Sequence, residues 1–205
     1  MKYLVLTFIL FSNLVIVRAQ DSTFKNGDLV FADLDCGELC DAIEAVTSGA
    51  KGQKFSHVGI IYRMGDSVLV VEAIGEKVQM SRYYQFKART NKPIYHARIH
   101  EYYYPILPNV MDFVLNQLNV PYDEEYKYDN GKYYCSEFIY DAFRVANHYE
   151  PVFDLEPMTF KQPGSNEYYP AWVKHFKKLR IPIPEGEAGI SPGSLSKSNK
   201  LVEVK

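Results

Sequence analysis

Hydrophobic residues change their spacing along the chain, and the first change predicts a strand followed by a helix. Residues 29–34 form a short, nearly continuous apolar run, which is typical of a buried strand. Asp35 and Glu38 have the spacing of a capping box, and Gly49 marks a helix end. Between them, one face of the predicted helix carries Leu39, Ala42, Ile43 and Val46.

Alternating apolar and polar residues replace the helical spacing after residue 52. Polar turns at residues 64–66 and 75–76 separate the first three of these segments, which indicates consecutive antiparallel strands. Four strands are predicted, over residues 55–62, 67–74, 78–80 and 94–99. The middle of the chain is therefore expected to form an antiparallel meander.

Helical spacing returns after Pro105. A helix is predicted from residues 105–108 to a point before Pro121, and another begins near Cys135 in the sequence YYCSEFIYDAF. From Pro151 onward the pattern is irregular, with many prolines, glycines and aromatic residues. Helices around a four- or five-stranded antiparallel sheet predict the α+β class.

The first 19 residues have the pattern of a secretory signal peptide. Lys2 precedes an apolar run over residues 3–16, and small residues allow cleavage after Ala19. No later apolar run reaches the roughly 18 residues of a membrane span. No cysteine directly follows the predicted cleavage site, so nothing in the pattern suggests a lipid anchor there. We therefore expect an exported protein, periplasmic or secreted, with one domain over residues 20–185 and a C-terminal tail over residues 186–205 that packs on it.

Composition and charge narrow the class of protein. At 205 residues, with 47% hydrophobic and 23% charged residues, the chain is long enough to bury a substantial core. Loss of Lys2 and Arg18 with the signal peptide would take the formal net charge from −2 to −4. An acidic balance gives no electrostatic reason to expect a nucleic-acid partner.

The chain has 3 cysteines, so at least one is unpaired. Cys36 and Cys40 share a face if both lie on the predicted helix, where Cβ atoms four residues apart are about 5 to 6 Å from each other. A disulfide needs about 3.5 to 4.5 Å, so a bridge here requires a distorted first turn and stays open. The spacing lacks a second cysteine or histidine pair, and no metal site is predicted.

Cys135 is the remaining thiol, and its position raises the question of catalysis. A thiolate at the N-terminus of a helix is stabilised by the helix dipole, although a helical cysteine usually only packs. A nucleophilic thiol also needs a base and a group that orients the base. His57 and Glu72 lie on the same predicted sheet face, on neighbouring strands, and supply these two roles. A lone histidine on a strand is more often structural. The hypothesis of a catalytic thiol therefore depends on the combination of Cys135, His57 and Glu72.

The hairpin turn decides how His57 and Glu72 meet. A turn centred on Met64 and Gly65 places the two residues directly opposite each other. A turn one residue later leaves them diagonal but still within reach. Gly59, two residues after His57 on the same face, is expected to leave room for another group, such as a helix N-terminus, beside the imidazole.

Four short blocks together resemble a known family. In order they are GDLVF at 27–31, SHVGI at 56–60, VEA at 71–73 and YCSEF at 134–138. They are similar to the circularly permuted, NlpC-type papain-like amidases of the YiiX-like group, in which the histidine strand precedes the cysteine helix. The resemblance implies a papain-like fold in which Cys135 is the nucleophile, His57 the base and Glu72 the residue that holds the base.

Further site residues follow less directly. Tyr122 or Tyr134 would give a second oxyanion donor, with Tyr122 ranked first, and Asp28 in the first block is another candidate for substrate contact. Cys36 is a rival nucleophile, but only 20 residues separate it from His57. The predicted helix occupies about 16 Å of that path, which leaves no intervening strand.

The resemblance implies a cysteine amidase or peptidase that forms a thiolate-derived acyl-enzyme and uses no cofactor. Export makes cell-wall peptides the expected substrate, as small peptides or peptidoglycan fragments. The alternatives are a lipid ester or amide acyl hydrolase or acyltransferase, and a binding protein whose site is catalytically dead. A polar open groove at Cys135 would favour the peptide substrate, and a deep apolar groove the acyl-lipid substrate.

Overall fold

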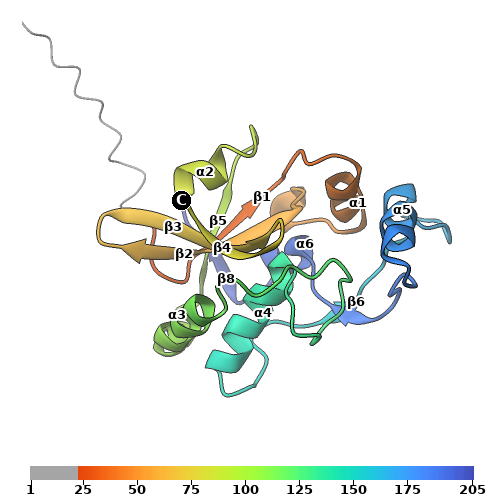
Figure 1. The fold of residues 1–205 in the computed structure, drawn as a ribbon. Coiled ribbons are helices and arrows are strands. Elements are labelled where there is room, and N and C mark those ends of the chain that lie inside the picture. The colour runs from red at the N-terminus through yellow and green to blue at the C-terminus, as the bar shows by residue number, and fades with distance from the viewer. Residues whose placement is uncertain (1–22) are drawn as a thin grey trace, which may run out of the picture.

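The computed structural model describes residues 23–205, so the predicted signal peptide lies outside the described residues. A six-stranded sheet with the order β4-β3-β2-β1-β5-β8 forms the centre of the molecule (Figure 1). All neighbouring pairs in it are antiparallel. The strands are β1 (Leu29–Ala32), β2 (His57–Met64), β3 (Ser67–Ile74), β4 (Lys77–Arg82), β5 (Tyr95–Ile99) and β8 (Leu201–Glu203).

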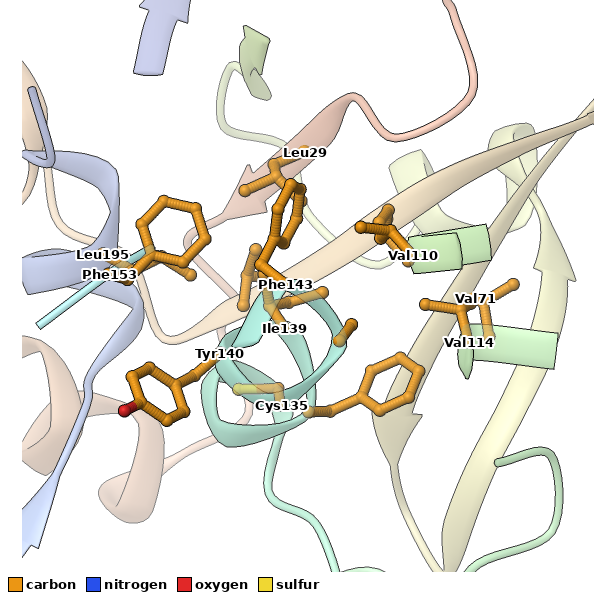
Figure 2. Close-up of a cluster of buried hydrophobic side chains, with 14 of the residues drawn as sticks. Leu29, Val71, Val110, Val114, Cys135, Ile139, Tyr140, Phe143, Phe153 and Leu195 are labelled. Atoms are coloured by element: carbon orange, nitrogen blue, oxygen red, sulfur yellow. The ribbon is translucent and has the colours of Figure 1, made fainter. Parts of the chain in front are cut away.

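Helices cover the sheet on both faces, so side chains on both sides of β2 and β3 are buried. Helix α2 (Tyr83–Lys87) lies on one face, where Phe86 packs against Ile61 and Val70. Helices α3 (Leu107–Asn116) and α4 (Cys135–Ala146) lie on the other (Figure 1). Figure 2 shows side chains from β1, β3, α3 and the C-terminal segment gathered around α4. The predicted α+β class is confirmed.

Two further helices pack against each other beside the sheet. Helix α1 (Glu38–Val46) contacts helix α5 (Pro170–Leu179), and both lie to the same side in Figure 1. A two-stranded sheet joins β6 (Glu156–Pro157) to β7 (Ala188–Gly189). Two short 3₁₀ helices, η1 (Ala50–Gly52) and η2 (Glu101–Ile106), complete the list. Within residues 23–205, every helix is too short or too polar to cross a bilayer.

The start of α1 differs from the prediction. The helix begins at Glu38, after Gly37, and no side chain caps it, so the predicted capping box at Asp35 was wrong. Gly37 has a φ of 88°, which turns the chain away from the helical path. Cys36 therefore lies outside the helix, with its Cα atom 5.5 Å from that of Cys40, and the two form a disulfide.

The β2–β3 hairpin has the later of the two possible turns. Met64 pairs with Ser67 and Ile60 with Val71, so Gly65 and Asp66 form a two-residue turn. Gly65 has a φ of 60°, the left-handed conformation that tight hairpin turns require. Of the two turns that the sequence allowed, the structure has the later one, and Glu72 is diagonal to His57.

The C-terminal segment belongs to the fold. Strand β8 pairs with β5 and forms an edge of the central sheet. Before it, the short helix α6 (Pro192–Ser196) buries Leu195 against the core around α4. The hydroxyl of Ser136 on α4 donates a 2.7 Å hydrogen bond to the carbonyl of Ile190. The contact with Ser136 places Ile190 next to the residue that follows Cys135.

Candidate active site

Helix α4 presents Cys135 at its first position. Tyr134 precedes it in an extended conformation, and the helix then continues to Ala146. The thiol is 5% exposed. Of the three cysteines, Cys135 is the free one, because Cys36 and Cys40 are joined. The disulfide removes Cys36 as a rival nucleophile in this state of the protein.

His57 begins β2 and connects the thiol with the carboxylate. Its Nε2 atom lies 2.7 Å from Oε2 of Glu72. Burial by itself would lower the pKa of His57, but interactions with the Cys135 and Glu72 side chains outweigh burial and raise that pKa to about 9. Because Nε2 bonds Glu72, Nδ1 is the ring nitrogen that is left to interact with the Cys135 sulfur. The imidazole is therefore favoured in its protonated form at neutral pH.

Glu72 is fully buried and its carboxylate accepts hydrogen bonds on both oxygens. Oε2 receives His57 and, at 2.6 Å, Nη1 of Arg89. Oε1 receives the Ser81 hydroxyl at 2.6 Å and Nη2 of Arg89 at 2.9 Å. Burial would raise the pKa of Glu72, but these partners, His57 first, lower it to about 2. Glu72 is thus an ionised group with no spare acceptor site.

Gly59 lies against side chains that pack on the sheet, and not beside the thiol. A Cβ atom at this position would collide with Val70 and lie 3.4 Å from Cβ of Glu72 and 3.5 Å from Phe86. The expectation that Gly59 leaves room for a helix N-terminus was therefore wrong. The missing side chain lets Val70 and Phe86 close over the buried Glu72. The ring of Phe86 also lies 5.8 Å from that of His57, centre to centre.

A narrow pocket of about 150 Å³ opens beside Cys135. Most of its lining side chains are apolar or aromatic, and they come from five separate parts of the chain. They are Ile43 and Val46 from α1, Tyr122, Tyr126 and Tyr134 from the loop before α4, Met158, Phe160 and Trp172, and Ile190 and Pro192 from the C-terminal segment. Glu156 is the only carboxylate or cationic side chain among the lining residues.

The two candidate tyrosines both line this pocket, but their hydroxyls differ. The Tyr134 hydroxyl accepts a 3.2 Å hydrogen bond from the N–H of Ile190 and points its own proton toward Met158. Burial, together with Tyr126 and Cys135, raises the pKa of Tyr122 well above its ordinary value. Burial also raises the pKa of Tyr134, so both hydroxyls keep their protons. The Tyr122 hydroxyl interacts with Tyr126, while the Tyr134 hydroxyl links Met158 to the C-terminal segment.

Asp28 is not brought to this site. Its carboxylate is 1% exposed and bonds the Arg98 guanidinium at 2.6 and 2.8 Å and the His96 ring at 2.7 Å. It lines a separate pocket, together with Lys25 and Tyr62. Asp28 therefore joins β1 to β5 at a distance from Cys135. Among residues 23–205, no group of three or more potential metal ligands is placed to hold an ion.

A thiol at a helix N-terminus, an imidazole and a buried carboxylate on an antiparallel sheet define a papain-like cysteine amidase or peptidase. The match to a family model supports this class: residues 23–205 match the permuted papain-like amidases, the YaeF/YiiX or C92 family. The chain belongs to that family.

A solved structure shares the fold. The crystal structure of the metalloprotein YiiX from Escherichia coli O157:H7 superposes with a TM-score of 0.73 at 21% identity, covering 88% of this chain and 96% of that one. No curated protein matched the chain in the sequence search.

Arg89, Ser81 and the far wall of the pocket were not predicted from the sequence. One signal was available for Arg89. A buried glutamate inside the apolar strand 67–74 needs charged or hydrogen-bonding partners. The sequence therefore indicates a cation from a neighbouring segment, without saying which one. The wall formed by residues 156–160 and 189–194 consists of ordinary apolar residues, which carry no such signal.

Proposed function

We propose that this protein is an exported amidase that hydrolyses the amide bond of a substrate with an apolar acyl group. The narrow, mainly apolar pocket beside Cys135 supports this choice. Cell-wall peptides, the expected substrate, carry several charges, whereas Glu156 is the only carboxylate or cationic side chain among the lining residues. Of the two substrate classes, the acyl amide is therefore the one that the pocket favours.

In the proposed reaction, the Cys135 thiolate attacks the carbonyl carbon while the acyl chain occupies the pocket. The C–N bond then breaks, and the imidazolium of His57 gives its proton to the leaving amine. A thioester to Cys135 remains. His57 takes a proton from water, whose oxygen attacks the thioester, and the acid leaves as the C–S bond breaks. Glu72 holds the imidazole in position throughout.

Two donors would stabilise the negative oxygen that forms during each attack. The backbone N–H of Cys135 heads α4, where first-turn N–H groups have no partner within the helix. The Tyr122 hydroxyl, which would turn from its partner Tyr126 toward the substrate, is the second. The Tyr134 hydroxyl already accepts from Ile190 and donates to Met158. Removal of such a donor typically lowers kcat on the order of 100-fold. Tyr122→Phe should cause a loss of this size if Tyr122, and not Tyr134, is the second donor.

Two observations support the proposed export. Residues 1–19 have the pattern of a signal peptide, although they lie outside the described residues. In addition, the Cys36–Cys40 disulfide is of the kind that persists in oxidising compartments. The processed N-terminus of protein recovered from outside the cytoplasm tests this part of the proposal.

The substrate is tested with a matched pair of chromogenic amides, N-decanoyl-4-nitroanilide and N-acetyl-4-nitroanilide. We expect turnover of the decanoyl amide to exceed that of the acetyl amide at least tenfold, because the longer chain fills the pocket. Purified muropeptides and a decanoyl ester are assayed beside them. Preferred cleavage of muropeptides would contradict the acyl proposal. No turnover, together with no alkylation of Cys135 by iodoacetamide at neutral pH, would indicate a binding protein.

A further inference from the structure

Arg89 meets Glu72 in a two-pronged contact. Nη1 bonds Oε2 at 2.6 Å and Nη2 bonds Oε1 at 2.9 Å, so the planar guanidinium faces the carboxylate edge to edge. This geometry fixes both the position and the rotation of a carboxylate, which a single contact does not do. The Arg89 side chain is 28% exposed, while Glu72 is completely buried.

The fold positions Arg89 through a short element. It lies in the turn directly after α2, where its backbone N–H donates to the carbonyl of Phe86 at 3.2 Å. Its guanidinium carbon lies 5.8 Å from the centre of the Phe86 ring. Because that ring also faces the ring of His57, α2 delivers an apolar cover and a cation to the same point. Ser81 on β4 supplies the remaining contact with Glu72.

The charges alternate along this row of side chains. Arg89 is positive, Glu72 negative, His57 positive in its protonated form, and Cys135 negative as a thiolate. During turnover His57 passes its proton to the leaving group and is briefly neutral. Without a second cation, Glu72 would then be a buried carboxylate with no charged partner, which is costly. A guanidinium keeps its charge at every working pH.

We propose that Arg89 is a positioning residue of the catalytic group, a permanent countercharge that keeps Glu72 ionised and aimed at His57 through both halves of the reaction. This inference rests on the proposed roles of Cys135, His57 and Glu72 and not on the identity of the substrate. It is therefore tested with iodoacetamide, which reads the thiolate directly, as well as with turnover of the decanoyl anilide.

The sign of the pH effect distinguishes this role from a purely structural one. The charged or polar groups that face Glu72 are His57 from β2, Ser81 from β4 and Arg89, and Cys135 faces His57 from α4. Removing a cation makes each acid nearby hold its proton to a higher pH. Arg89→Met should therefore move the acid limb of the alkylation profile, and both limbs of the turnover profile, upward by about one pH unit.

The experiment compares the parent protein with five variants: three single changes at Arg89 and Lys87, the Glu72→Gln variant, and Glu72→Gln combined with Arg89→Met. Arg89→Met should lower kcat by about tenfold or more with little change in KM, since Arg89 lies beyond the substrate pocket. Arg89→Lys, which keeps the charge but not the fork, should recover the pH profile and part of kcat. Lys87→Met removes an exposed cation two residues away and should leave both readouts unchanged. In the Glu72→Gln background, Arg89→Met should add less than a twofold further loss.

The outcomes test the role of Arg89 separately from the proposed amidase function. An Arg89→Met protein whose pH profiles match those of the parent, or whose loss is equally large in the Glu72→Gln background, would overturn the role of Arg89. If Arg89→Met fails to fold, the pH profile of Arg89→Lys decides. A pH profile that matches the parent's, together with a reduced kcat, supports the charge role. A pH shift equal to that of Glu72→Gln contradicts it. Alkylation remains informative even if the decanoyl anilide is not a substrate.

Discussion

The proposed catalytic group and the proposed substrate pocket are held in different ways. Glu72, His57 and Cys135 lie on β3, β2 and α4, and hydrogen bonds and charges fix them around a buried carboxylate. The pocket walls instead come from α1, from residues 156–160 and from the C-terminal segment, and are held mainly by packing of aromatic and aliphatic side chains. The difference teaches that reactivity and substrate choice are separable in this molecule, and four changes test that separation.

The largest effect is expected at the thiol itself. Cys135→Ala should reduce turnover to background, a loss on the order of 10⁵-fold or more, and should abolish labelling by iodoacetamide. It should still bind the decanoyl acid, measured by calorimetry, because the pocket walls are unchanged. The control, Cys36→Ala with Cys40→Ala, should keep activity within about twofold, since the disulfide stabilises the loop and not the reaction. The reverse pattern would assign the nucleophile to Cys36.

Loss of the carboxylate should have the next largest effect. Glu72→Gln should lower kcat roughly 100-fold or more, because the imidazole loses its fixed partner. The pKa of His57 is raised to about 9, so turnover of the parent should decline as the pH passes that value. Glu72 helps to raise this pKa, and the alkaline limb should therefore move to lower pH in the variant. An unshifted limb in a pH–rate profile would show that Glu72 does not act through His57.

A change in the pocket should alter selectivity and leave the thiol unaffected. Val46 lines the pocket and is half-buried, so Val46→Phe should shorten the usable space. Activity on the decanoyl amide should fall by about tenfold relative to the acetyl amide, while the rate of alkylation stays the same. Val173→Phe, on the exposed face of α5, is the matched control. Equal loss on both amides would mean that the acyl chain binds elsewhere.

The smallest effect is expected where the two regions touch. Ser136→Ala removes the hydrogen bond to Ile190 and leaves a buried carbonyl without that donor, which should cost about 1 to 3 kcal/mol in the free energy of unfolding. Urea denaturation measures this cost. Because the bond anchors the C-terminal segment, selectivity between the two amides should weaken more than alkylation of Cys135. If alkylation slows equally, the segment also supports the thiol.

The same separation explains what the sequence could predict. Strands 67–74 and 94–99, the helix at Cys135 and the face shared by His57 and Glu72 followed from spacing, because strands and helices that bury one face repeat their apolar residues with characteristic periods. The register did not, since Met64, Gly65 and Asp66 allow two turns and only the left-handed Gly65 decides between them. The start of α1 was missed for a similar reason, because Gly37 overrides the capping pattern.

The C-terminal third was the least predictable part. Strand β8 has three residues and α6 has five, which is too short for any periodicity to show. Helix α5 begins at a proline after two tyrosines, in a segment whose composition indicates a loop. These elements are ordered by contacts with distant residues, such as the pairing of β8 with β5. Single-sequence patterns contain no information about such partners.

The position of the C-terminal segment has a consequence for how the protein matures. Residues 189–194 enclose the space beside a thiol that is made more than 50 residues earlier in the chain. In a polypeptide delivered from its N-terminus onward, strands β1 to β5 and the thiol helix therefore emerge before the wall that is proposed to select the substrate exists. Such an enzyme acquires its discrimination only when synthesis or translocation is finished, and a chain cut short would carry a reactive sulfur without its filter.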